Sequence, residues 1–407
     1  MMKTQRRAFL LAGMLCAAGA WMAPGTVSAQ AKHAHGGSAA RDLGTGAAFD
    51  KDGRLWVVTK ETEGTDQYVV LRSSTDMGRT WSAGKRIQSA PEPVAASGEA
   101  RPHIAIGSKG ELYISYTSTI ARPHIGDIRF VRSLDGGKTF SAPVTVHANR
   151  DRTVHSFESM VVDAEGRIFI AWIDGRGAMQ AKQQNTPYAG SAVYYAVSKD
   201  RGASFQGDYK VADHACECCR IGMSLNHRGT PVVMWRHIFA PNIRDHALAE
   251  LGVDGKVPEI RRASFDDWAV DACPHHGPSV AFGSDGKRHQ VWFSGKEGDP
   301  SGALYAVASA GKLGAPVSLG AAQASHADVA VRGKHVAVVW KEFDGTSTAI
   351  MARQSDDGGA TWTQSEASRT ETGSDKPYLI QSPAGIVLIW RTQDEGIRVI
   401  PLQRTKA

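Results

Sequence analysis

The chain has 407 residues, of which 47 are Lys or Arg and 41 are Asp or Glu, and its formal net charge is +6 at pH 7. Three of the positive charges, on Lys3, Arg6 and Arg7, lie near the N-terminus, and the rest of the sequence carries no basic stripe, so no nucleic-acid partner is expected. Glycine is abundant at 43 residues, and no long apolar stretch of helical period follows residue 30, which is typical of an all-β protein.

Residues 1–31 are predicted to be an export signal peptide. The three cations precede an apolar run from Ala8 to Ala20, and Val27-Ser28-Ala29 or Ala29-Gln30-Ala31 offers the small residues that a signal peptidase needs. The apolar run is too short for a retained membrane helix, so no stable membrane insertion is expected.

The export route follows from the residues around the two arginines. The order Gln5-Arg6-Arg7-Ala8-Phe9-Leu10 resembles the twin-arginine signal, although paired arginines also occur in ordinary signal peptides. We therefore expect a periplasmic or secreted protein that leaves the cytoplasm by the Tat or the Sec route. Residues 32–37 are predicted to form a flexible tail that contains His33 and His35.

The remaining residues, 38–407, contain four copies of one short motif, S-x-D-x-G-x-[TS]-[WF]. In each copy we expect the Asp to accept backbone N–H bonds across a tight turn, the Gly to take a positive φ, and the closing aromatic ring to pack between neighbouring sheets. The copies are Ser74–Trp81, Ser133–Phe140, Ser198–Phe205 and Ser355–Trp362. The motif resembles the Asp-box, or BNR repeat, of the sialidase-like β-propellers.

Each motif belongs to a larger repeated unit. The units are about 50 to 60 residues apart, which is the period expected of four-stranded propeller blades. They begin near Gly44, Arg101, Ser156, Cys218, Cys273, His326 and Lys376. We therefore predict an all-β fold, a single β-propeller of about seven four-stranded blades, with the six blades usual in sialidases as the alternative. The last unit has room for three strands, so a strand from Ala39 to Leu43 is expected to complete it.

The four cysteines after the signal segment lie in two neighbouring units. They are Cys216, Cys218, Cys219 and Cys273, and the alignment of Ser224-Leu225 with Ser279-Val280 places Cys218 and Cys273 at equivalent positions of adjacent blades. One interpretation is two structural disulfides, which an exported location favours. The most plausible single bridge then joins Cys218 or Cys219 to Cys273, but the Cys-x-Cys-Cys spacing is awkward for two unstrained bridges.

The other interpretation is a transition-metal site. Thiolate and imidazole ligands select copper(I) or zinc over hard cations, and the exported location favours copper, with zinc as the alternative. The candidate ligands are His214, Cys216, Cys218, Cys219, Cys273, His275 and His276. No metal is expected if the cysteines form two disulfides.

The resemblance to sialidases implies a second possible function, exo-glycosidase action on acidic sugars. Sialidases hold the substrate carboxylate with three arginines and use a tyrosine nucleophile, its glutamate partner and an aspartate acid/base. By position in the repeat, the candidates are Arg101, Arg236 and Arg391 for the clamp, Asp174 for the acid, Glu158 for the partner and Tyr378 for the nucleophile. The sequence departs from the sialidase Arg-Ile-Pro signature, since its nearest matches are Arg101-Pro102 and Arg220-Ile221-Gly222.

The function expected first is therefore the binding of a thiophilic metal at the channel mouth. A small glycan is the ligand if the chain is a glycosidase. A third possibility is a scaffold for a periplasmic protein partner, because propellers often serve as rigid platforms.

Overall fold

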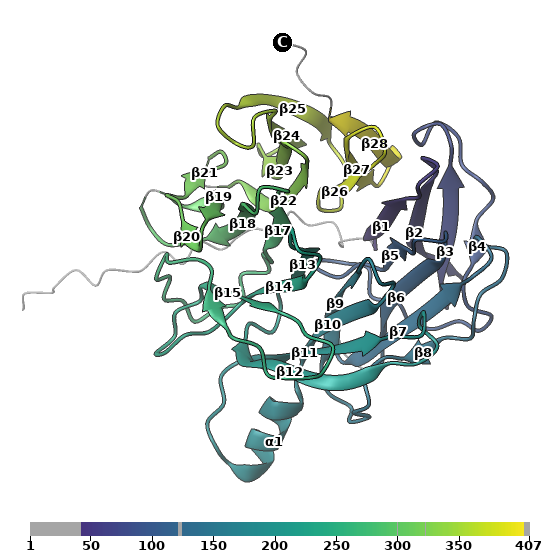
Figure 1. Cartoon of the computed structure of the whole chain (residues 1–407), viewed down its shortest axis with the longest axis horizontal. Coiled ribbons are helices and arrows are strands. Elements are labelled where there is room, and N and C mark those ends of the chain that lie inside the picture. The colour runs from purple at the N-terminus through teal and green to yellow at the C-terminus, as the bar shows by residue number, and fades with distance from the viewer. Residues whose placement is uncertain (1–41, 121–123, 299, 322, 403–407) are drawn as a thin grey trace, which may run out of the picture. The chain divides into compact units, whose positions relative to one another are not determined.

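The computed structural model describes residues 42–120, 124–298, 300–321 and 323–402. Within this part of the chain, seven antiparallel sheets follow one another around a ring, each sheet forming one blade (Figure 1). The prediction of an all-β propeller with seven blades is confirmed, and the six-bladed alternative is set aside. The export signal and the tail predicted at 1–37 lie outside the described residues.

The first three blades take their strands in chain order. Blade 1 contains β1 (Thr45–Phe49), β2 (Leu55–Glu63), β3 (Asp66–Ser74) and β4 (Lys85–Arg86). Blade 2 contains β5 (His103–Ile106), β6 (Leu112–Thr119), β7 (Gly126–Ser133) and β8 (Val144–Thr145). Blade 3 contains β9 (His155–Val162), β10 (Ile168–Asp174), β11 (Ser191–Ser198) and β12 (Gln206–Ala215), with helix α1 (Arg176–Gln184) inserted between β10 and β11.

The last four blades repeat the same order. Blade 4 contains β13 (Gly222–Leu225), β14 (Pro231–Arg236), β15 (His246–Glu250) and β16 (Arg261–Arg262). Blade 5 contains β17 (Ser279–Phe282), β18 (Arg288–Ser294), β19 (Gly302–Ser309) and β20 (Lys312–Leu313), and β21 (Val317–Ser318) also pairs with β19. Blade 6 contains β22 (Ser325–Arg332), β23 (His335–Phe343), β24 (Thr348–Ser355) and β25 (Thr363–Thr370). Blade 7 contains β26 (Tyr378–Gln381), β27 (Ile386–Thr392) and β28 (Gly396–Leu402).

The repeated turn joins each of four blades to the blade before it. In the third copy, Asp200 Oδ1 accepts a hydrogen bond from the Ser204 backbone N–H at 3.0 Å, and Gly202 adopts a φ of 76°. A Cβ on Gly202 would lie 2.4 Å from the ring of Phe130 in blade 2, so only glycine fits this turn. The ring of Phe205 packs against the same Phe130 with centroids 4.9 Å apart. The turn therefore fixes the spacing between neighbouring sheets.

A tryptophan fills the centre of five second strands. These side chains are among the largest fully buried ones, and they are Trp172, Trp235, Trp292, Trp340 and Trp390. Trp172, Trp235, Trp340 and Trp390 pack against the blade before, and Trp292 packs within blade 5, so the apolar core is divided into clusters along the ring rather than gathered in one place.

The ring closes by packing blade 1 against blade 7. Leu55 and Val57 from β2 share a buried cluster with Val387 and Ile389 from β27. The Thr45 backbone N–H also donates to Asp375 Oδ2 at 3.1 Å. Blade 7 has three described strands, as predicted. Residues 39–41 of the predicted closing strand lie outside the described residues, and Asp42 and Leu43 are not in a strand.

We expect Leu55→Ala to lower the free energy of unfolding by about 2 to 5 kcal/mol, because it opens a cavity in the closing cluster. Urea denaturation followed by tryptophan fluorescence measures this change. The matched control is Leu134→Ala, since Leu134 is 46% exposed, and it is expected to stay within about 0.5 kcal/mol of the wild type. Equal effects of the two substitutions would contradict closure by packing.

Candidate functional site

A buried carboxylate at the centre of the ring contacts residues from four other blades. Glu99 precedes β5 in blade 2, and its Oε2 accepts from Arg220 Nη1 at 3.0 Å and from the Gly277 backbone N–H at 2.9 Å. Its Oε1 lies 3.1 Å from His326 Nδ1 and 3.3 Å from Lys376 Nζ. These partners belong to blades 4 to 7. We call Glu99, Arg220, His326 and Lys376 the central ion cluster.

The charges of the central ion cluster compensate one another. Burial raises the pKa of Glu99, but the charges of Lys376 and Arg220 outweigh burial and hold this pKa well below its usual value. Burial lowers the pKa of Lys376 to about 7, although Glu99 opposes the change. The Glu99 carboxylate is therefore ionised at neutral pH, and its charge is the one that holds the cations in place.

A cavity of about 100 Å³ lies beside the central ion cluster, and Glu158 lines it. The strand β9 bulges here, because Phe157 and Glu158 together stand opposite Trp172, and Phe157 has a φ of 57°. Such a bulge redirects a side chain, in this case that of Glu158. Its Oε2 accepts from Thr117 Oγ1 at 2.5 Å, whereas Oε1 is buried without a hydrogen-bond partner. Burial raises the pKa of Glu158 to about 7.

Two more of the predicted catalytic residues, Arg101 and Tyr378, line the same cavity. The guanidinium of Arg101 lies 4.9 Å from the centre of the Tyr378 ring and donates to the backbone oxygen of Thr45. The other arginine at the cavity, Arg220, donates to Glu99 and to the backbone oxygen of Ala327. Both guanidinium groups are thus engaged by the protein, which leaves them poorly disposed to clamp a carboxylate.

The other predicted catalytic residues do not line this cavity. Arg236 is buried and donates to the backbone oxygens of Arg244, His276 and Phe293. Arg391 lies on β27, and its Nη1 is buried without a hydrogen-bond partner. The structure therefore brings together Arg101, Glu158 and Tyr378 but not the three-arginine set expected from the sialidase resemblance.

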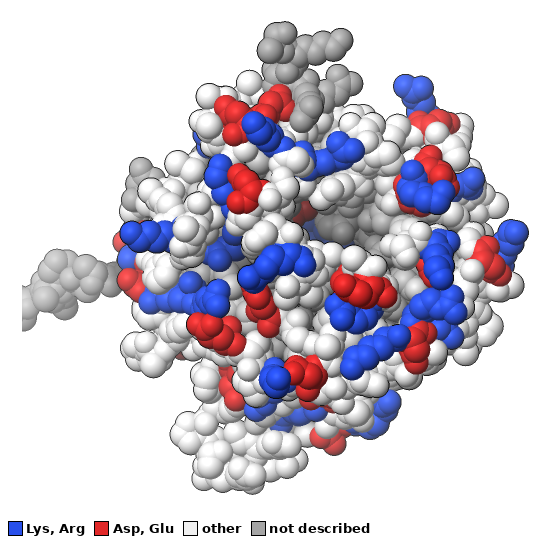
Figure 2. Space-filling model, in the orientation of Figure 1, with Lys and Arg blue, Asp and Glu red and all other residues white. Residues whose placement is uncertain are grey.

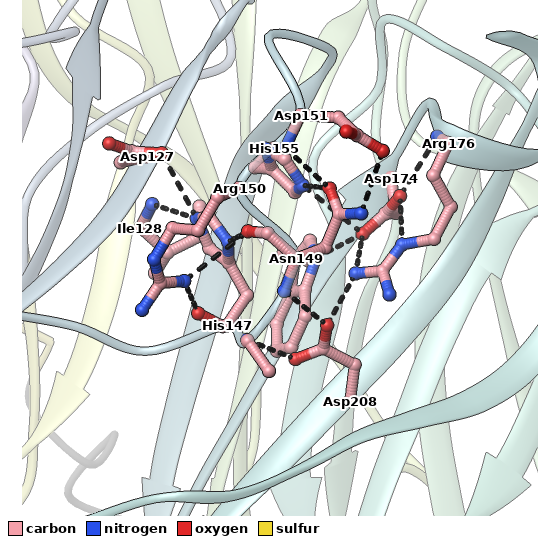
Figure 3. A network of polar contacts seen from close by, with 12 residues as sticks. Asp127, Ile128, His147, Asn149, Arg150, Asp151, His155, Asp174, Arg176 and Asp208 are labelled. Carbon is pink, nitrogen blue, oxygen red and sulfur yellow. Dashed lines mark hydrogen bonds and ion pairs between the residues drawn. The ribbon is translucent and has the colours of Figure 1, made fainter.

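The proposed acid, Asp174, belongs to a separate polar network in blade 3 (Figure 3). It accepts hydrogen bonds from Trp172 Nε1 at 2.8 Å and from Arg176 Nη2 at 2.7 Å, and Arg176 also binds Asp208 at 2.7 Å. Because its carboxylate is paired with Arg176 in a completely buried position, Asp174 fits a structural role.

His147 and His155 stack within that network, with ring centroids 3.9 Å apart, and form a potential ligand group with Asp127. The His147 nitrogens are already used, because Nδ1 lies 2.6 Å from the Asn149 backbone oxygen and Nε2 accepts from the Ile128 backbone N–H at 3.2 Å (Figure 3). A metal would have to break these bonds, so this group fits a structural role better.

A second potential ligand group consists of three thiols in the loop between β12 and β13. The sulfur atoms of Cys216 and Cys218 are 3.7 Å apart, those of Cys216 and Cys219 3.8 Å, and those of Cys218 and Cys219 4.0 Å. The three residues are 1%, 4% and 2% exposed. We call them the thiol triangle.

Cys273, the fourth cysteine among the described residues, is exposed. The Cys216 thiol and burial raise the pKa of Cys273, but the Cys273 sulfur does not belong to the group of sulfurs that lie within 4.8 Å of one another. All four cysteines are free, and no described sulfur pair is at the 2.0 Å or so of a disulfide. The structure thus gives no support to the disulfide interpretation.

The predicted imidazole ligands lie elsewhere. His276 Nδ1 is 3.4 Å from His326 Nδ1, next to the central ion cluster. His214 Nδ1 is 3.0 Å from the Ala189 backbone oxygen, and His275 is exposed. Among the described residues, the ligand atoms within 4.8 Å of one another at this site are three thiols and no imidazole.

Positive charge lies next to the thiol triangle. Arg244 Nη1 is 3.5 Å from Cys216 Sγ. The charge of Arg236 favours a lower pKa of the Cys216 and Cys219 thiols. Hydrogen bonds from the neighbouring thiols, above all from Cys218, lower the pKa of Cys216. Hydrogen bonding to Cys216 and burial raise the pKa of Cys219 to about 12. Cys216 is therefore the thiol most ready to bind as a thiolate.

The comparisons with known proteins identify the fold. No protein-family model matches the chain, and no curated protein matches it. Among solved structures, the chain is similar to the polysaccharide lyase Uly1, at 11% identity over 90% of this chain and 91% of that one, with a TM-score of 0.57. It is also similar to an ulvan lyase of family PL25 bound to -[GlcA(1-4)Rha3S]-, at 12% identity over 87% of this chain and 90% of that one, with a TM-score of 0.54. The chain has the β-propeller fold of these proteins. A sialidase from Trypanosoma rangeli matches at 13% identity over 76% of this chain and 54% of that one, with a TM-score of 0.44.

On the face seen in Figure 2, Lys and Arg side chains alternate with Asp and Glu, so this face has no large patch of one charge. No helix within the described ranges has the length and hydropathy needed to span a membrane.

Glu99→Gln is expected to lower the free energy of unfolding by about 3 to 5 kcal/mol at pH 7, because it leaves Lys376 and Arg220 without their buried anion. The pKa of Glu99 is depressed on folding, so its contribution is present above the unfolded pKa and disappears as the pH falls through the folded one. The difference between the two proteins should therefore shrink in strong acid. Urea denaturation over a pH series measures it, and Glu165→Gln, at an exposed ion pair, is the control.

Proposed function

We propose that the protein binds one thiophilic metal ion, copper(I) first and zinc second, through the thiol triangle. The observation that supports the proposal is the spacing of the three buried sulfur atoms, which measures 3.7, 3.8 and 4.0 Å. With metal–sulfur bonds of about 2.3 Å, the expected sulfur–sulfur distance is about 3.8 Å for a tetrahedral and about 4.0 Å for a planar trigonal site. The thiols are thus spaced to share one ion.

The number of ligands favours copper(I). Structural zinc is almost always bound by four ligands, whereas the thiol triangle supplies three buried ones, a number that copper(I) accepts. Copper(I) with three thiolates carries a net charge of −2. The guanidinium groups of Arg244 and Arg236 next to Cys216 offset part of that charge. Zinc would need Cys273 as its fourth ligand.

Protein purified without chelator is expected to carry close to one metal ion per chain by elemental analysis, and the three thiols of the thiol triangle should react with a labelling reagent only after the metal is removed. Cys216→Ser should lose the metal, because it removes one of the three sulfur ligands, the one that lies 3.7 Å from Cys218 and 3.8 Å from Cys219. Circular dichroism checks that the variant remains folded.

The control for this experiment is Ser224→Ala, a substitution in the next strand that leaves all thiols in place. It should retain the metal. Wild-type protein that stays free of metal after incubation with copper(I) and with zinc would contradict the proposed function.

A second candidate function is sialidase-like exo-glycosidase action on acidic sugars in the central cavity. The observation that favours it is Glu158, a buried acid whose Oε1 has no partner at a cavity that Arg101 and Tyr378 also line. The likeness to two polysaccharide lyases, one solved with -[GlcA(1-4)Rha3S]-, supports acidic sugars as the substrate class. Glu158 would donate a proton to the leaving group.

This candidate predicts release of the fluorophore from a fluorogenic sialoside or glucuronide, and loss of that activity in Glu158→Gln. Since the pKa of Glu158 is raised to about 7, the protonated acid is present below that pH, and the rate should fall as the pH rises above it. Glu165→Gln is the matched control. Absence of turnover with both substrates at high protein concentration would rule the glycosidase out.

A further inference from the structure

Arg244 lies in the loop between β14 and β15, and its guanidinium contacts the thiol triangle. Its Nη1 donates to Cys216 Sγ at 3.5 Å, and its Nε donates to the backbone oxygen of Val270 at 2.8 Å. The Arg244 backbone N–H donates to the Trp268 oxygen at 2.9 Å, and the Arg244 oxygen accepts from Arg236 Nη1 at 2.9 Å. Hydrogen bonds to both the backbone and the side chain therefore fix this positive charge beside the sulfur.

Two other charged groups near the thiol triangle are placed differently. Arg236 is buried, but its guanidinium donates to three backbone oxygens. Glu217 lies between the cysteines in the sequence, and it is exposed, so water weakens the effect of its charge. Arg244 is therefore the cation whose hydrogen bond reaches a sulfur atom directly.

The charge of the bound complex differs between the two candidate metals. Copper(I) carries one positive charge and zinc carries two, so three thiolates give a net charge of −2 with copper(I) and −1 with zinc. The three thiols are at most 4% exposed. Since charges interact more strongly in a buried site than in water, a fixed cation stabilises the copper(I) complex more than the zinc complex.

We propose that Arg244 is the residue that makes the thiol triangle select copper(I) over zinc, an inference that deepens the proposed function and rests on it. The guanidinium binds no metal itself. It donates a charge-assisted hydrogen bond to the sulfur of Cys216, and it keeps its own charge throughout. Either ion displaces the same three thiol protons to solvent, and no electron is transferred, so the two complexes differ in net charge alone.

The test compares the affinities of copper(I) and zinc for the same three sulfurs. All the full-length proteins carry Cys273→Ser, so that zinc cannot gain a fourth thiolate. Copper(I) affinity is measured without oxygen by competition with bathocuproine disulfonate, and zinc affinity by competition with a coloured zinc chelator. In Arg244→Gln the ratio of copper(I) affinity to zinc affinity should fall by about tenfold, the effect of one unit charge near a buried site.

Two control variants separate charge from structure. Arg244→Lys keeps the charge, so its affinity ratio should stay within about threefold of the starting value. Arg261→Gln removes the same charge from a side chain that is 61% exposed, and it should leave the ratio unchanged. The Val270 oxygen also accepts from Asn242 Nδ2 at 3.2 Å, so it keeps a partner when Arg244 is replaced.

An unchanged ratio in Arg244→Gln, including an equal or complete loss of both ions, would overturn the inference, because a residue that only supports the loop affects both metals alike. A fall in Arg244→Lys as large as that in Arg244→Gln would also overturn it, since charge would then not be the cause. Protein with Arg244 in place that binds neither ion overturns the proposed function itself, and the two failures are thereby distinguished.

Discussion

The propeller depends on one fully buried negative charge. Seven sheets that pack side by side bring their inner strands together at the axis, where the loops leave polar groups facing one another. Glu99 satisfies a guanidinium, an ammonium group, an imidazole and a backbone N–H from four other blades. Without that carboxylate the cations would repel one another in a medium of low dielectric constant. The central ion cluster thus holds the loops before the inner strands in fixed positions around the axis.

The thiol triangle depends on this arrangement because it shares a loop with one of the cations. Cys219 is followed directly by Arg220, which binds Glu99. Arg236, which acts on Cys216 and Cys219, also donates to the backbone oxygen of His276 in the loop that carries Cys273. The two loops that carry the sulfur atoms are thus anchored by charged hydrogen bonds, which hold the thiols in place.

The sequence predicted the parts of this molecule that repeat. Four copies of the turn motif and the spacing of the units were enough to predict the fold and the blade number. Glu99 was missed because it lies in a loop without a motif. Only its position in the repeat could have pointed to Glu99, because it precedes an inner strand just as Arg220 and Lys376 do. The partner of Asp174 could not be read from the sequence, because a charged residue after a strand-end tryptophan can bind within its own blade, here to Arg176.

The contacts of Glu99 also link the two ends of the chain. Its partners Gly277 and His326 lie 178 and 227 residues away in the sequence, and Lys376 precedes the final blade. A chain that emerges from the ribosome blade by blade therefore acquires the partners of this carboxylate one after another, Arg220 with blade 4 and Lys376 with blade 7. The set of contacts around Glu99 is complete only when blade 7 is present. A product that ends before blade 7 would lack Lys376 and keep Glu99 only partly compensated, so the same residue that holds the ring together also favours complete rings over incomplete ones.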